Sequence, residues 1–109
     1  MSGVEEINLH ISNLKETLYF YEGILGFQPS KQRPQLHVPG VWYDVGQVRL
    51  CCVVNKMRKK RDIKVKLSSA EIEKVKKKLD YYKVGYVERE TALFLYDPDE
   101  HSLQLQLLS

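Results

Sequence analysis

Two carboxylates, Glu6 and Asp62, occupy equivalent positions in two similar segments that lie 56 residues apart. In each segment, 6–12 and 62–68, polar and apolar residues alternate strictly, which is typical of a strand with one face in a core and the other in a polar environment. If the two carboxylates converge, they could hold a divalent metal ion, or like-charge repulsion could keep one of them protonated for proton transfer. If they do not converge, they are surface carboxylates that balance nearby cations such as Arg49.

The other candidates for chemistry are a histidine, a cysteine and a tryptophan in strand-like segments. His10 lies four residues after Glu6 on the same predicted face, and histidine changes charge near neutral pH, which suits acid–base catalysis. A lone histidine on a polar strand face is more often hydrogen-bonded or solvated. Cys51 could be a nucleophile if a base such as His10 lowered the pKa of its thiol, or it could be a small half-buried strand residue. Trp42 and Tyr43 point to opposite faces of their strand, so one should pack in the core and the other could form an aromatic wall for a ligand.

Each alternating segment leads into a predicted helix. Asn13 with Glu16, and Ser68 with Glu71, have the spacing of a capping box. The apolar residues that follow recur at helical spacing, and Gly26 is predicted to end the first helix. Strand-like segments follow each helix, near 27–31, 41–45 and 48–55 in the first half and near 86–88, 91–96 and 102–107 in the second. The chain is therefore predicted to be an α+β domain with the order βαβββ twice.

The four longest predicted strands are apolar along one face and polar along the other. Because the helices can cover only one face of a sheet, the polar faces are either exposed to solvent or, if the sheet curls, line a cup. We predict the second arrangement, a curved mixed sheet around a cup with the helices on the outer face. The polar faces of these four strands include Asn8, His10, Arg49, Cys51, Lys64, Gln104 and Gln106.

Length and composition indicate one folded domain. The 109 residues fit a single domain, 1–109, with modules at about 5–55 and 61–108, and 43% hydrophobic residues are enough for a core. The net charge is +3, and its basic clusters carry no interleaved aromatic residues, so nucleic-acid binding is not expected. No apolar run approaches the roughly 20 residues that span a bilayer, the start does not resemble a signal peptide, and the two cysteines are adjacent and unsuited to a disulfide. We therefore expect a cytoplasmic protein without a membrane partner.

Three segments in order resemble the vicinal-oxygen-chelate superfamily, which includes glyoxalases, dioxygenases and bleomycin- and fosfomycin-resistance proteins. Residues 13–27 resemble its helix signature, in which Phe-Tyr precedes Leu-Gly-Phe. Residues 40–50 resemble its hairpin, and residues 94–104, with Asp-Pro-Asp, resemble its closing turn and strand. The resemblance covers essentially the whole chain and implies the fold of this superfamily.

The resemblance also implies a metal ion in the cup, held by the first and last strands of each module. Carried over to this chain, those positions are Glu6, Asp62, Cys51 and Gln104, although histidine is typical of the first two and glutamate of the last. Glu6, Asp62 and Gln104 offer hard oxygen donors that suit Mn²⁺ or Mg²⁺, whereas Cys51 would favour a softer ion, so Mn, Mg, Ni and Zn are the candidates. A cup that has lost its metal, and binds its ligand by shape and hydrogen bonds, is the alternative.

We therefore predict a small-molecule-binding protein, or a metal-dependent lyase or transferase, that takes a polar or anionic compound. The candidate catalytic residues are Glu6, Asp62 and His10. The candidate ligand-binding residues are Asn8, His10, Trp42, Arg49, Cys51, Lys64 and Gln106. The alternatives are a metal-free sequestering protein of the antibiotic-binding kind and an interaction module that uses the basic loop 56–61. The resemblance further implies a homodimer with the site at or near the subunit contact.

Overall fold

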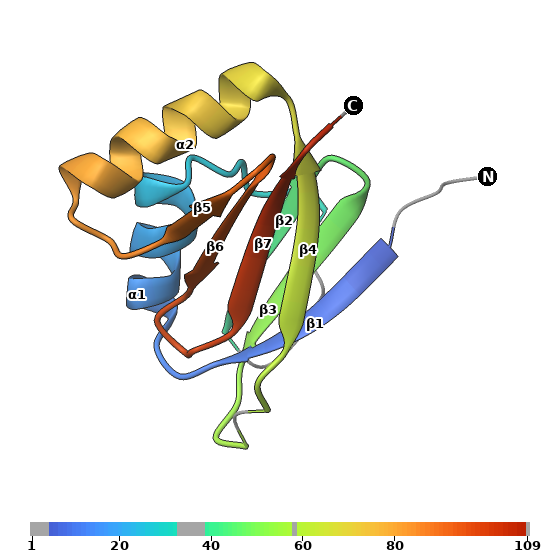
Figure 1. The fold of residues 1–109 in the computed structure, drawn as a ribbon. Coiled ribbons are helices and arrows are strands. Elements are labelled where there is room, and N and C mark those ends of the chain that lie inside the picture. The colour runs from blue at the N-terminus through green and yellow to red at the C-terminus, as the bar shows by residue number, and fades with distance from the viewer. Residues whose placement is uncertain (1–4, 33–38, 58, 109) are drawn as a thin grey trace.

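The computed structural model describes residues 5–32, 39–57 and 59–108, and its elements follow the predicted order (Figure 1). The first module comprises β1 (Glu5–Ile11), α1 (Leu14–Leu18), the π-helix η1 (Tyr19–Ile24), β2 (Gly40–Val45) and β3 (Val48–Val54). The second module comprises β4 (Asp62–Leu67), α2 (Ser69–Tyr81), β5 (Val87–Arg89), β6 (Ala92–Tyr96) and β7 (Ser102–Leu107). No helix in these described ranges is long and apolar enough to cross a membrane.

Each module forms its own small mixed sheet. The strand order is β1-β3-β2 in the first sheet and β4-β7-β6-β5 in the second. In both sheets the first strand of the module runs parallel to the last, and the remaining pairs are antiparallel. The α+β class and the repeated topology are thus confirmed, with the strands divided between two sheets.

The first module has one strand fewer than the sequence predicts. In place of a strand near 27–31, the structure has a single bridge between Pro29 and Tyr43, and the Ser30 amide donates to the Trp42 carbonyl over 2.7 Å. Proline has no amide hydrogen to donate to a ladder, so a regular strand is disfavoured at this place.

The apolar faces of both sheets and the helices share one core. Both helices lie on the same side of the strands, and the fully buried side chains include Leu9, Leu50, Ile63 and Leu105 (Figure 1). Burying a leucine or isoleucine side chain contributes about 1.5–3 kcal/mol, so the alternation of apolar residues fixes which face of each strand turns inward. The opposite, polar faces are left for a site.

The helix starts confirm the predicted caps. The Ser68 hydroxyl accepts from the Glu71 amide while the Glu71 carboxylate accepts from the Ser68 amide, and Asn13 Oδ1 accepts from the Glu16 amide over 3.0 Å. The first helix changes from α to π after Leu18, which the sequence pattern did not predict.

A buried polar network joins the two modules. The Tyr21 hydroxyl of η1 donates to Asp97 Oδ2 over 2.6 Å, and Asp97 Oδ1 accepts from the His101 amide. His101 Nδ1 accepts from the Arg61 amide over 3.0 Å, so Nε2 carries the proton and donates to the His10 carbonyl over 2.7 Å. Burial raises the pKa of Asp97, and these hydrogen bonds oppose that rise. The Asp-Pro-Asp turn therefore holds the modules in one arrangement.

Candidate functional site

The polar face of the second sheet carries its side chains in three rows of cross-strand neighbours. Alternate residues of a strand share a face, so the strand register decides which side chains meet. From β4 towards β5, the rows are Asp62–Ser102–Tyr96, Lys64–Gln104–Phe94–Val87 and Lys66–Gln106–Ala92–Arg89. We call these residues the second-module face.

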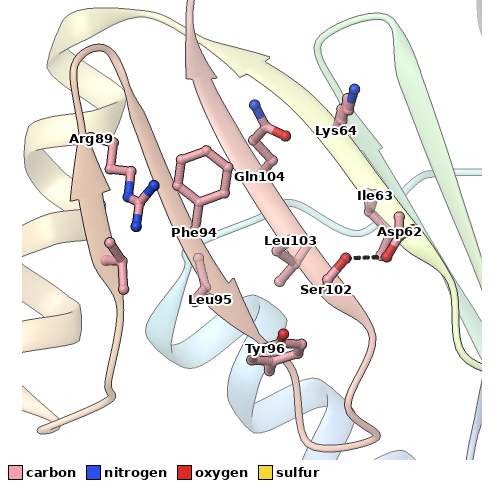
Figure 2. Close-up of a pocket in the computed structure, with 11 residues that line it drawn as sticks. Asp62, Ile63, Lys64, Arg89, Phe94, Leu95, Tyr96, Ser102, Leu103 and Gln104 are labelled. Carbon is pink, nitrogen blue, oxygen red and sulfur yellow. Dashed lines mark hydrogen bonds between the residues drawn. The ribbon is translucent and has the colours of Figure 1, made fainter.

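A cavity of about 490 Å³ lies over the first two rows of the second-module face. Figure 2 shows Phe94 near its centre, with Arg89 on one side, and with Gln104 and then Lys64 on the other. Its volume falls in the range of roughly 300–1,000 Å³ that is usual for small-molecule sites. Asp62, Ile63, Val87, Leu95, Tyr96, Ser102 and Leu103 complete the lining.

The cavity combines exposed aromatic rings with cations that form no ion pair among the described residues. Phe94 is 37% exposed and Tyr96 is 68% exposed, so both rings keep surface that a ligand could cover. The side chains of Lys64 and Arg89 form no ion pair within the described part of the chain. Asp62 is already engaged, because its carboxylate accepts a hydrogen bond from the Ser102 hydroxyl over 2.5 Å (Figure 2). Apolar surface and free positive charge are therefore both available to a ligand.

A second hollow of about 490 Å³ lies where the two modules meet, and we call it the intermodule cleft. Lys64, Lys66 and Gln106 line it from the second module. Glu5, Gly46, Gln47 and Val48 line it from the first module, and Leu108 completes it. Lys64 thus belongs to both hollows.

On the polar face of the first sheet, Arg49 joins several neighbouring side chains. Arg49 donates from Nε to Asp44 Oδ1 over 2.7 Å and from a terminal nitrogen to Gln32 over 3.1 Å. Its other close carboxylate is Glu6, at 3.6 Å, and its guanidinium lies 5.1 Å from the centre of the Trp42 ring. These contacts raise the pKa of Arg49, chiefly through the hydrogen bond to Asp44. Two predicted ligand-binding residues, Arg49 and Trp42, therefore bind each other.

Cys51 lies in the next row of this face, between Asn8 and Trp42. Its side chain is buried, and this burial, with Glu6 nearby, raises the pKa of the thiol. A nucleophilic cysteine needs the opposite shift, because the thiolate is the reactive form. Asn8 beside it is exposed.

His10 forms its side-chain hydrogen bond with a loop and not with Cys51. Its Nδ1 lies 2.6 Å from the Met57 carbonyl oxygen, so the ring donates to the loop that follows β3. In the strand register His10 pairs with Val53, one row beyond Cys51. No hydrogen bond among the described residues joins the two side chains, so the structure does not bring together the predicted base and nucleophile.

The three predicted metal ligands do not form a common donor set. Glu6 pairs with Arg49 in the first sheet, whereas Asp62 accepts from Ser102 in the second. Gln104 lies one row beyond Asp62. Among the histidine, cysteine, aspartate and glutamate side chains that the structure describes, no group of three or more could hold a metal ion. Glu6, Asp62 and Gln104 therefore do not together form the implied metal site.

The basic loop between the modules is exposed. Lys60 pairs with Glu100 over 2.7 Å, and residue 58 lies outside the described residues. Ion pairs between exposed side chains contribute little to stability, so the pair of Lys60 with Glu100 adds little to the fold.

No protein-family model and no curated protein matches the sequence, but solved structures match the fold. The structure of a protein assigned to the glyoxalase family from Bacillus anthracis matches with a TM-score of 0.79 at 13% identity, over 100% of this chain and 97% of that one. The fosfomycin resistance protein FosX from Listeria monocytogenes matches with a TM-score of 0.72 at 16% identity, over 100% and 93%. The antibiotic-binding protein TnmS3 from Streptomyces sp. CB03234 matches with a TM-score of 0.74 at 16% identity, over 100% and 98%.

The chain has the vicinal-oxygen-chelate fold. The repeated topology, βαββ in the first module and βαβββ in the second, and full-length matches of this quality agree on that conclusion, and the resemblance drawn from the sequence is confirmed at this level. Identities below one quarter do not transfer a substrate or a reaction.

Sequence reasoning missed several residues that line the cavity. Lys64, Asp62 and Gln104 were predicted site residues and do line it, whereas Phe94, Tyr96 and Arg89 were not predicted. A signal for the two aromatic residues existed, because they alternate with the buried Leu93 and Leu95 and must therefore face the polar side. Arg89 gave no comparable signal, since β5 is short and exposed throughout.

Proposed function

We propose that this protein binds a small molecule on the second-module face and does so without a metal ion. The observation that carries the proposal is the cavity of about 490 Å³ that exposed Phe94 lines together with Lys64 and Arg89, two cations that form no ion pair with any residue the structure describes. A mostly apolar hollow with a few polar groups is typical of ligand sites. The fold similarity to TnmS3, an antibiotic-binding protein, supports a sequestering role.

A screen of small molecules by thermal shift tests this proposal. A ligand should raise the melting temperature of the wild type, because it binds the folded state only. Phe94→Ala should weaken binding about tenfold or more, since aromatic contact is lost. Tyr81→Ala is the matched control, because Tyr81 is 78% exposed and lies outside the cavity. Equal weakening by both variants, or no effect of Phe94→Ala, would contradict the proposal.

A metal-dependent lyase or transferase is the second candidate. It is favoured by one observation, namely that Asp62 and Gln104, two of the three predicted ligands, line the same cavity. Elemental analysis after incubation with Mn²⁺, Mg²⁺, Ni²⁺ or Zn²⁺ separates the candidates. One metal ion per chain that is lost in Asp62→Ala would support the enzyme, and a ligand that binds equally with and without chelator would support metal-free binding.

We also propose a homodimer. Val87 and Tyr96 expose apolar surface beside Phe94, and a second copy that covers these two side chains while leaving Phe94 to the ligand would reduce that exposure. Light scattering after size-exclusion chromatography measures the mass directly, and twice the chain mass of 12.8 kDa is expected.

A further inference from the structure

The cavity and the intermodule cleft meet at one side chain. Lys64 lines both hollows, each of about 490 Å³. Its neighbours differ sharply on the two sides, with Phe94 and Tyr96 in the cavity and Lys66 with Gln106 in the cleft. A single ligand could therefore meet aromatic surface at one end and cations at the other.

Both hollows carry more positive than negative charge. In the cavity, Lys64 and Arg89 face one carboxylate, Asp62, which is engaged by Ser102. In the cleft, Lys64 and Lys66 face one carboxylate, Glu5. None of the three cations forms an ion pair within the described residues. An anion at Lys64 would thus be attracted from both sides.

The strand register sets the spacing that the ligand must match. Lys64, Gln104 and Phe94 lie on successive strands of one row. Neighbouring strands are about 4.8 Å apart, so the backbones that carry Lys64 and Phe94 are separated by about 10 Å. The Gln104 amide, which can donate and accept, lies between them. A flat ring on Phe94 with an acidic group on its edge or on a short arm spans this distance.

On the basis of the proposed function, we propose that the ligand is an aromatic acid whose ring lies against Phe94 and whose anionic group binds Lys64 at the mouth of the intermodule cleft. A carboxylate, a sulfonate and a phosphate share the chemistry that Lys64 and Lys66 recognise. Arg89, on the far side of Phe94, adds a cation that can lie over the ring or bind a second acidic group.

Three probes separate the ring from the charge. 2-Naphthoate carries both features, 2-naphthylmethanol keeps the ring without the charge, and cyclohexanecarboxylate keeps the charge without the aromatic ring. Titration of the full chain is followed by amide resonances in two-dimensional NMR, which report both affinity and position. We expect 2-naphthoate to shift resonances of β4, β6 and β7 and to bind about tenfold or more tightly than either other probe.

Two variants test the assignment of each feature. Lys64→Met keeps the aliphatic stem and removes the charge, so it should weaken 2-naphthoate about tenfold and leave 2-naphthylmethanol unchanged. Phe94→Ala should weaken both aromatic probes. Lys74→Met, at an exposed lysine of α2 that lines neither hollow, is the control and should change nothing.

The outcomes distinguish this inference from the proposed function. If 2-naphthylmethanol binds the second-module face as tightly as 2-naphthoate, the acidic group is irrelevant and the inference is overturned while the binding function stands. If all three probes leave the resonances of β4, β6 and β7 unmoved at millimolar concentration, the inference is overturned, whereas the proposed function is still judged by the thermal-shift screen. If Lys64→Met loses affinity for 2-naphthoate and Lys74→Met does not, the result supports both the inference and the proposed function.

Discussion

The two modules repeat one topology but differ in what their polar faces leave free. Equivalent rows read Glu6–Arg49–Asp44 in the first module and Asp62–Ser102–Tyr96 in the second. In the first row the arginine binds both carboxylates and covers Trp42, so charge and aromatic surface are used up within the protein. In the second row a serine takes the arginine's place, and the cations and rings around it stay accessible. A repeat fixes where a side chain lies, whereas its neighbours decide whether it can bind a ligand.

The largest expected difference between the faces is in thiol chemistry. Cys51, on the polar face of the first sheet (the first-module face), and Cys52, in the core, are both buried, and burial raises the pKa of each thiol. Both should react with a thiol reagent about a hundredfold or more slowly in the folded chain than in the unfolded chain. Ser102→Cys places a thiol on the second-module face and should add one fast-reacting group. Fast labelling of the wild type would show that the first-module face is open after all.

The two faces keep their relative positions only if the modules stay packed together, and the hydrogen bond from Tyr21 to Asp97 is one contact that joins the modules. Tyr21→Phe removes the hydroxyl that donates to buried Asp97 and should lower the free energy of unfolding by about 1–3 kcal/mol, measured with urea. Because the pKa of Asp97 is raised above 3.8 in the folded chain, its ionisation disfavours folding, and stability falls as pH rises through that range. Loss of the hydroxyl raises this pKa further. The deficit of Tyr21→Phe should therefore be larger at pH 7 than below about pH 3, and an equal deficit at both would contradict the role of Asp97.

A smaller change in stability is expected when the contacts of Arg49 on the first-module face are removed. Arg49→Gln removes the hydrogen bond that, more than any other contact, lowers the pKa of Asp44 below 3.8. A depressed carboxyl pKa contributes stability above its unfolded value, and this contribution is lost as pH falls through the folded value. The variant should melt about one to four degrees lower at pH 7 and match the wild type near pH 2. A difference that persists in acid would place the role of Arg49 in packing against Trp42 instead.

Much of the fold could be predicted from local pattern. The alternation in 6–12 and 62–68 identified both first strands and their buried faces, and the capping residues Asn13 and Ser68 placed both helix starts. These signals are local, because a strand period and a cap depend on a few consecutive residues. The π-helix that follows Leu18 had no signal in this pattern, whereas Pro29 was a local signal against a regular strand near 27–31.

The candidate site was harder to predict, because its side-chain contacts join segments that are far apart in the sequence. Lys64 and Gln104 could be assigned to a polar face from alternation alone. The hydrogen bonds of Arg49, however, are made to Asp44 and Gln32 from other segments, and His10 binds the carbonyl of Met57 in a loop. Side-chain partners across strands follow from register, and register is set by the whole sheet.

The central claim is that the second-module face binds the ligand because its charges and rings are not bound to one another. The most direct test is to introduce on this face the ion pairs that Arg49 forms on the first-module face. The double variant Ser102→Arg and Tyr96→Asp rebuilds the row of carboxylate, guanidinium and carboxylate beside Asp62. Amide NMR with 2-naphthoate should show shifts on β4, β6 and β7 in the wild type and at least about tenfold weaker binding in the variant, with the strand resonances otherwise retained. Undiminished binding by the variant, or shifts on β1, β2 and β3 instead, would contradict the claim that the second module holds the ligand.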